Sequence, residues 1–158
     1  MVFVDTIAIG PWSFDQNMKR FKREASLKPF VKKYLHNQGY DVQRPEVRFF
    51  ERRIDLMGFS THDMKLVSIE LKLHKWRKAF QQAILYQLCS DFVIVALPAQ
   101  NTESIELDRF IRHGIGVLRV FKDGNSVILS EPTQSTVMKS QYKQRYIDFL
   151  KGYRYAAR

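Results

Sequence analysis

Residues 64–98, MKLVSIELKLHKWRKAFQQAILYQLCSDFVIVALP, decide the fold. Apolar and polar side chains alternate over residues 64–73, which is typical of a strand. From about Lys75 to Ser90 the apolar residues repeat at helical spacing. The segment Asp91–Pro98 is continuously apolar after its first residue, as expected for a strand that is covered on both faces. A strand, a crossover helix and a second strand form a βαβ unit, so we expect an α/β fold with a partly parallel sheet.

The chain before this unit adds a helix and two strands. Apolar residues repeat at intervals of three and four from Ser26 onward, and Gly39 follows as a stop signal. Segments 41–50 and 52–60 have strand patterns, and a short turn joins the second of them to the strand at residues 64–73.

The chain after the unit continues the same architecture. We expect a short helix over residues 103–113, opened by Asn101 and Thr102, and then a hairpin of strands at 114–121 and 126–130. Aromatic residues at helical spacing and an excess of Lys and Arg predict a basic amphipathic helix over about residues 139–156. No repeat or flexible linker divides the chain, so we expect residues 1–158 to form one domain.

Composition narrows the classes of partner. The chain has 26 Lys and Arg against 16 Asp and Glu, a formal net charge of +10, and the basic excess lies in residues 1–53 and 99–158. This layout suits a polyanion, chiefly nucleic acid, although an anionic membrane surface would attract the same residues. The single Cys89 excludes an internal disulfide and a cysteine-based zinc site. The longest apolar run, Phe92–Pro98, is too short to span a bilayer, and no signal peptide is evident, so we expect a cytoplasmic, nucleoid-associated protein.

Three charged side chains stand where their neighbours are apolar. Glu70 and Lys72 are two residues apart, so both emerge from one face of a strand, and Asp55 occupies an equivalent place on the preceding strand. If these strands pair as a hairpin, two carboxylates and an ammonium share one small patch, and a divalent cation would relieve the repulsion between the carboxylates. We therefore expect a site for Mg²⁺ or Mn²⁺ at Asp55 and Glu70, with Lys72 acting on water or on phosphate. His74 continues the alternation as a candidate phosphate contact.

The same residues have a plainer interpretation. A Glu-x-Lys pair on an amphipathic strand is usually a solvated ion pair that contributes under about 1 kcal/mol. Only the combination of an upstream acid, the pair on the strand and the helix after it favours catalysis.

This combination resembles the PD-(D/E)XK nuclease superfamily, in its Mrr-like or Holliday-junction-resolvase-like branches. The resemblance rests on Ile54-Asp55 and Ile69-Glu70-Leu71-Lys72, covers about residues 24–120, and includes a QxxxY pattern at Gln82 and Tyr86. It implies a restriction-endonuclease-like fold, a central mixed β-sheet flanked by helices with an αβββαβ core. It also implies that Gln82 and Tyr86 lie near the active site, whereas the helix alone favours a core tyrosine and a surface glutamine.

The family often places a further glutamate on its first helix, and Glu24 is the nearest candidate here. If Pro29 kinks a longer helix, Glu24 reaches the metal; if the helix begins at Ser26, Glu24 is an exposed acid.

Basic residues flank the proposed patch on both sides, where a phosphodiester backbone would run. Arg48, Arg52 and Arg53 precede the Asp55 strand, and Lys75, Arg77 and Lys78 open the helix after Lys72.

The leading hypothesis is a Mg²⁺-dependent DNA endonuclease that cleaves phosphodiester bonds through Asp55, Glu70 and Lys72. We expect a homodimer, because cutting two strands calls for two centres. The alternatives are a non-catalytic nucleic-acid-binding domain on the same fold and a basic interaction protein without nucleic acid.

Overall fold

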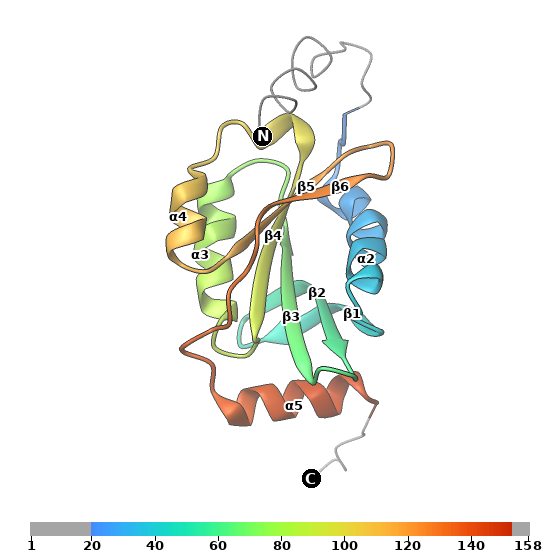
Figure 1. Cartoon of the computed structure of the whole chain (residues 1–158), viewed down its shortest axis with the longest axis vertical. Helices are drawn as coiled ribbons and strands as arrows, with labels where there is room; N and C mark the ends of the chain where they lie inside the picture. Colours follow the sequence, from blue (N-terminus) through green and yellow to red (C-terminus); the bar gives the residue numbers. More distant parts are fainter. Residues whose placement is uncertain (1–19, 153–158) are drawn as a thin grey trace, which may run out of the picture.

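Six strands form one mixed sheet whose spatial order follows the sequence, in a computed structural model that describes residues 20–152 (Figure 1). The strands are β1 (Val42–Phe49), β2 (Arg52–Ser60), β3 (Lys65–Leu71), β4 (Phe92–Pro98), β5 (Gly116–Val120) and β6 (Ser126–Ser130). Pairing is antiparallel from β1 to β3, parallel from β3 to β5, and antiparallel between β5 and β6. The predicted α/β class, the βαβ unit and the final hairpin are therefore confirmed.

The helices cover the two faces of this sheet. A 3₁₀ turn, η2 (Glu24–Leu27), leads into α2 (Lys28–Asn37), which buries Val31 and Leu35 against one face. The other face is covered by α3 (Trp76–Tyr86), α4 (Leu107–Arg112) and α5 (Ser140–Leu150), and η3 (Ala99–Asn101) follows β4. In Figure 1, α2 lies on one side of the sheet and α3 and α4 on the other, while α5 crosses one end. No helix within residues 20–152 is long and apolar enough to cross a bilayer.

Several element boundaries differ from the sequence-based expectation. The helix expected at 103–113 begins only at Leu107, because the Thr102 hydroxyl donates to Ala99 O and the Ser104 hydroxyl donates to Asn101 O, which closes local turns instead. The helix expected at 139–156 ends at Leu150. Gly152 follows in the left-handed region at φ 78°, which stops a helix. Residues 153–156 of that prediction, and the whole N-terminal segment before residue 20, lie outside the described residues.

The sheet is interrupted beside Asp55. Between β1 and β2, Pro45 pairs with Leu56 and Val47 pairs with Ile54, but Glu46 and Asp55 between them are not paired. Glu46 has a positive φ of 53°. The ladder between β2 and β3 runs only as far as Leu56 and its partner Ile69. Asp55 thus stands in neither ladder, at the point where β2 separates from β3. This local opening exposes an edge of β3 to side chains.

Candidate active site

Asp55 bridges the gap between the separating strands with its carboxylate. Its Oδ2 accepts a hydrogen bond of 2.7 Å from the backbone N–H of Leu71, in place of a ladder partner from β2. Leu71 is itself paired with Ala96 of β4, so the carboxylate is fixed relative to the centre of the sheet. The side chain is half-buried, and its position depends on the strand geometry rather than on a flexible loop.

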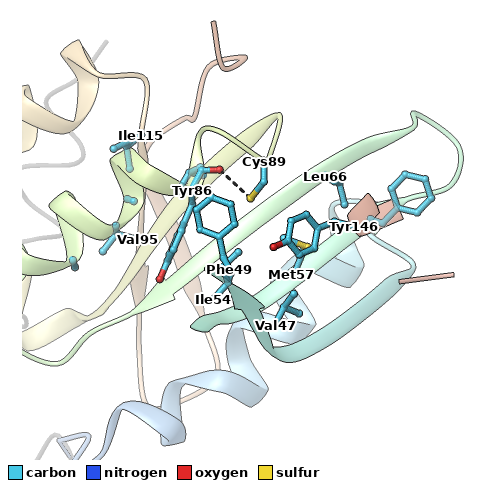
Figure 2. Close-up of a cluster of buried hydrophobic side chains, with 14 of the residues drawn as sticks. Val47, Phe49, Ile54, Met57, Leu66, Tyr86, Cys89, Val95, Ile115 and Tyr146 are labelled. Atoms are coloured by element: carbon cyan, nitrogen blue, oxygen red, sulfur yellow. Dashed lines mark hydrogen bonds between the residues drawn. The ribbon is translucent and has the colours of Figure 1, made fainter. Parts of the chain in front are cut away.

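Glu70 points to the α3 face of the sheet and is only 3% exposed. Its Oε2 accepts a hydrogen bond of 3.1 Å from the hydroxyl of Tyr86, which is also 3.1 Å from the carbonyl oxygen of Arg53. Tyr86 thereby joins α3 to both β2 and β3. Figure 2 shows the ring of Tyr86 beside that of Phe49, and the two ring centroids are 6.1 Å apart.

Lys72 lies between two acids. Its Nζ is 3.8 Å from Oε1 of Glu70 and 3.7 Å from Oε1 of Glu24, and its side chain is 14% exposed. β3 ends at Leu71, short of the predicted end at residue 73, but Lys72 N still donates to Ala96 O and keeps the strand direction. Glu24 is 46% exposed and reaches Lys72 from η2, a separate turn before α2, so neither alternative for its position was fully correct.

The pKa values of both carboxylic acids in this cluster are raised, so its positive charge does not suffice to keep them ionised. Burial, followed by the negative charge of Asp55, raises the pKa of Glu70 to about 8. Burial also raises the pKa of Asp55, with Glu46 and Glu24 contributing, although the hydrogen bond from Leu71 opposes the rise. The ammonium of Lys72 lowers both values without offsetting the rise. A further cation beside the two carboxylates would favour their ionised forms.

The donor set fits an open site for a hard divalent ion and does not form a closed cage. Among residues 20–152 there is no group of three or more His, Cys, Asp and Glu side chains arranged to hold a metal. Magnesium, however, is commonly bound by one or two carboxylates together with water and substrate phosphate. Asp55 accepts from Leu71 through Oδ2 and Glu70 accepts from Tyr86 through Oε2. The second oxygen of each carboxylate would therefore be the metal ligand, and that of Glu70 lies 3.8 Å from Lys72 Nζ.

The remaining predicted catalytic residue, Gln82, lies one turn before Tyr86 on α3. Its Oε1 is buried and has no hydrogen-bond partner within the described part of the chain. Tyr86 contacts Glu70 of the acid cluster, whereas Gln82 is not hydrogen-bonded through that oxygen to Lys72.

The predicted nucleic-acid contacts divide into two groups. Arg52, Arg53, Lys75 and Lys78 are exposed, and Lys75 caps α3 in a left-handed conformation at φ 55°. The other three already have partners in the protein: Arg48 Nε donates to Phe50 O, His74 Nδ1 lies 3.3 Å from Asn101 Nδ2, and Arg77 pairs with Glu106 at 3.2 Å.

Arg77 is directed away from the carboxylates. Its guanidinium lies over the ring of Trp76 at 4.4 Å, on the side of α4, where Glu106 directly precedes that helix.

Two further acids have roles that the sequence analysis did not predict. Glu46 is exposed on β1, and its negative charge raises the pKa of Asp55. Asp91 is 1% exposed and binds Leu66 N, Gln134 and Lys143. Burial alone would raise the pKa of Asp91, but these hydrogen bonds lower it. An acid directly before a continuous apolar strand was the available signal, because a buried carboxylate requires partners.

Comparisons with known proteins address the fold. No protein-family model matches the chain, and no curated protein matches it significantly. Among solved structures, the chain is similar to the SPO1766 protein of unknown function from Silicibacter pomeroyi, with a TM-score of 0.62, 16% identity and 86% coverage of each chain. A second structure, SfsA of Pyrococcus furiosus in complex with Ca²⁺, has a TM-score of 0.38 and 13% identity, covering 73% of this chain and 63% of that one, a likeness too weak to define a shared fold. The first likeness shows a common fold, and in this chain it is a mixed α/β fold whose six-stranded sheet is flanked by helices.

Proposed function

We propose that the chain is a divalent-metal-dependent DNA endonuclease of the PD-(D/E)XK type. The observation that carries this proposal is the convergence of Asp55, Glu70 and Lys72 at the point where β2 leaves β3. Asp55 comes from β2, whereas Glu70 lies in β3 and Lys72 directly follows that strand. Burial holds the acids where ionisation is costly without another cation.

Each side chain has a distinct role in this proposal. Asp55 and Glu70 hold Mg²⁺ or Mn²⁺, which when bound supplies Lewis acidity toward phosphate and lowers the pKa of a coordinated water. Lys72, 3.8 Å from Glu70, donates hydrogen bonds to the attacking water or to the phosphoryl oxygens. Tyr86 orients Glu70 through its hydroxyl, and Glu24 orients the ammonium of Lys72.

Charge supports nucleic acid as the substrate. The chain carries +10 overall, and the exposed Arg52 and Arg53 begin the strand that holds Asp55. Lys75 and Lys78 are also exposed and follow Lys72 closely in the sequence. Such clustered cations contact the backbone phosphates and leave the base sequence unread.

The test compares the wild type with Asp55→Asn, Glu70→Gln and Lys72→Met on supercoiled, linear and branched DNA, with Mg²⁺, Mn²⁺ or EDTA. We expect metal-dependent cleavage that falls by at least about a hundredfold in each variant, as is typical when a group that stabilises transition-state charge is removed. Asparagine at position 55 keeps an oxygen for the backbone N–H of Leu71. Asp63→Asn and Lys33→Met, both at exposed positions, serve as matched controls. Unchanged cleavage in Glu70→Gln would reject the assignment.

A non-catalytic nucleic-acid-binding domain is the second candidate. One observation favours it: Lys72 lies between Glu70 and Glu24 and forms an ion pair with each of them. The charges of these acids are thus partly balanced within the protein itself. In that case DNA binding is salt-dependent, neither metal produces cleavage, and the three substitutions leave binding unchanged.

Assembly and location follow from the same proposal. Because two strands require two centres, a nuclease that makes double-strand breaks acts as a homodimer associated with the nucleoid. Sedimentation of the protein with and without DNA tests the dimer, and a monomer that only nicks DNA would contradict it.

A further inference from the structure

A pocket of about 550 Å³ lies between the end of β1 and α5. Most of its lining is aromatic, from Phe49, Phe50, Tyr142, Tyr146 and Phe149. The rings of Phe50 and Tyr142 meet edge to face with centroids 5.8 Å apart. Two of the five aromatic residues are exposed, since Phe50 is 63% exposed and Phe149 is 47% exposed. The pocket thus offers aromatic surface that the protein itself leaves uncovered.

Phe50 is held in an unusual conformation. Its φ of 53° lies in the left-handed region, which bulky residues rarely adopt. The side chain of Arg48 donates from Nε to Phe50 O at 3.2 Å, and the ring of Phe49 packs against that of Phe50 at 4.9 Å. A strained backbone that holds a large ring in solvent is a feature found at ligand sites.

The polar groups of the pocket suit a nucleotide. Arg48 and Arg145 line it, and guanidinium groups are common phosphate contacts in nucleic-acid complexes. Glu46 lines it as well, and a carboxylate accepts hydrogen bonds from exocyclic amino groups of bases. Aromatic faces between cations are the usual elements of single-strand binding surfaces.

The pocket adjoins the acid cluster. Glu46 belongs to its wall and also acts electrostatically on Asp55. Phe49, another wall residue, lies 6.1 Å from the ring of Tyr86, whose hydroxyl contacts Glu70. A base in the pocket would therefore be attached to a backbone that passes the proposed catalytic groups.

We propose that this pocket receives an unstacked nucleobase from a single-stranded part of the DNA, stacked against Phe50 and Phe149. The inference rests on the proposed function for the choice of nucleic acid as ligand. The volume suffices for one base and excludes a duplex, whose bases are stacked and shielded. The preferred substrates are therefore those with unpaired bases, such as single strands, flaps and branched junctions.

The test measures affinity without catalysis. A single-stranded oligonucleotide containing 2-aminopurine is titrated with the protein in EDTA, and a duplex of the same sequence is titrated in parallel. The wild type binds the single strand more tightly and quenches the 2-aminopurine fluorescence by stacking. Phe50→Ala and Phe149→Ala each weaken this binding about tenfold or more and lose the quench, the range expected for one lost stacking partner. Ile111→Ala, an exposed apolar residue on α4, is the matched control and binds like the wild type.

The conservative variant Phe50→Trp keeps a stacking face, so it retains binding even if Phe50→Ala proves unstable. Equal single-strand affinity of Phe50→Ala, Phe149→Ala and the wild type would overturn the inference. So would a Phe50→Ala variant that changes only the sedimentation coefficient, because the pocket would then hold a protein segment or a second copy of the chain.

This inference and the nuclease proposal fail separately. If the wild type does not cleave DNA but Phe50→Ala loses single-strand binding, the pocket assignment stands without the nuclease. If the wild type cleaves and Glu70→Gln does not, while Phe50→Ala and Phe149→Ala bind normally, the nuclease stands without the pocket.

Discussion

Replacing Glu70 with glutamine should stabilise the fold, and the gain should grow with pH. The pKa of Glu70 is raised to about 8, against 4.5 for an ordinary glutamic acid. Between these values the folded protein keeps the proton that the unfolded chain has released. The contribution of protonated Glu70 to the free energy of unfolding is therefore fully present below about pH 4.5 and is lost as the pH rises through about 8. Glutamine at this position has no proton to lose.

The magnitude follows from the two pKa values. One pKa unit corresponds to about 1.4 kcal/mol, so the interval between 4.5 and about 8 amounts to roughly 5 kcal/mol. This figure is an upper limit, because the folded site can relax or take up a counter-ion. At pH 5 the free energies of unfolding of wild type and Glu70→Gln should be close. At pH 9 the variant should be more stable by several kcal/mol.

Urea unfolding in EDTA at pH 5, 7 and 9 measures this difference. Histidines and other titrating groups remote from Glu70 are common to both proteins and cancel in the comparison. Glu103→Gln, an exposed glutamate, provides the control and should follow the wild type at every pH. If the difference between wild type and Glu70→Gln is the same at pH 5 and pH 9, the electrostatic reasoning is wrong.

The same experiment in Mg²⁺ extends the prediction. A cation that binds the folded state stabilises it by mass action. At pH 8 the wild type should gain stability with increasing Mg²⁺, while Glu70→Gln gains less, because it lacks one of the two carboxylates. Equal gains would place the bound cation elsewhere.

Three further predictions concern single contacts. Tyr86→Phe removes a hydrogen bond that lowers the pKa of Glu70, so the acidic limb of the pH–rate profile should move up by about one pH unit; an unmoved limb contradicts the contact. Asp91→Ala leaves buried donors without an acceptor and should cost at least about 3 kcal/mol in urea unfolding; a loss no larger than that of an exposed aspartate contradicts it. Gly116→Ala places a Cβ 2.8 Å from Pro132 Cδ and should cost about 1–3 kcal/mol; an unchanged Tm contradicts the close packing.

Much of the sheet was predictable because its strands carry strong patterns. The continuous apolar run predicted a strand at Asp91–Pro98, and β4 begins one residue later at Phe92. Few other elements bury both faces over so short a length. The helix at 103–113 was placed too early, because Asn101 and Thr102 use their side chains in other contacts. Asn and Thr are frequent at helix starts and in isolated turns alike, so pattern alone does not separate the two.

The candidate site was predictable in part. Alternation along β3 placed Glu70 and Lys72 close together, and the short connection from β2 brought Asp55 beside them. The near-complete burial of Glu70 was not predictable, because an alternating pattern predicts a solvated polar face. That burial depends on α3, which places Tyr86 over the carboxylate.

Contacts between segments far apart in the sequence were not predictable either, because they depend on tertiary structure. Glu24 meets Lys72 across 48 positions of sequence only because a 3₁₀ turn precedes α2. Arg77 pairs with Glu106 instead of facing the acid cluster. The sequence around Arg77 contains no pattern that predicts this partner.

The contacts of Asp91 constrain how the protein is made. The acid heads a central strand, yet two of its partners, Gln134 and Lys143, come from the last part of the described chain. During synthesis the strand leaves the ribosome well before those partners exist, so a nascent chain carries a carboxylate that has Leu66 N but lacks Gln134 and Lys143. Completion of the native state must therefore wait for the C-terminal helix, and a ribosome stalled before residue 143 would present a chain that chaperones and proteases can engage.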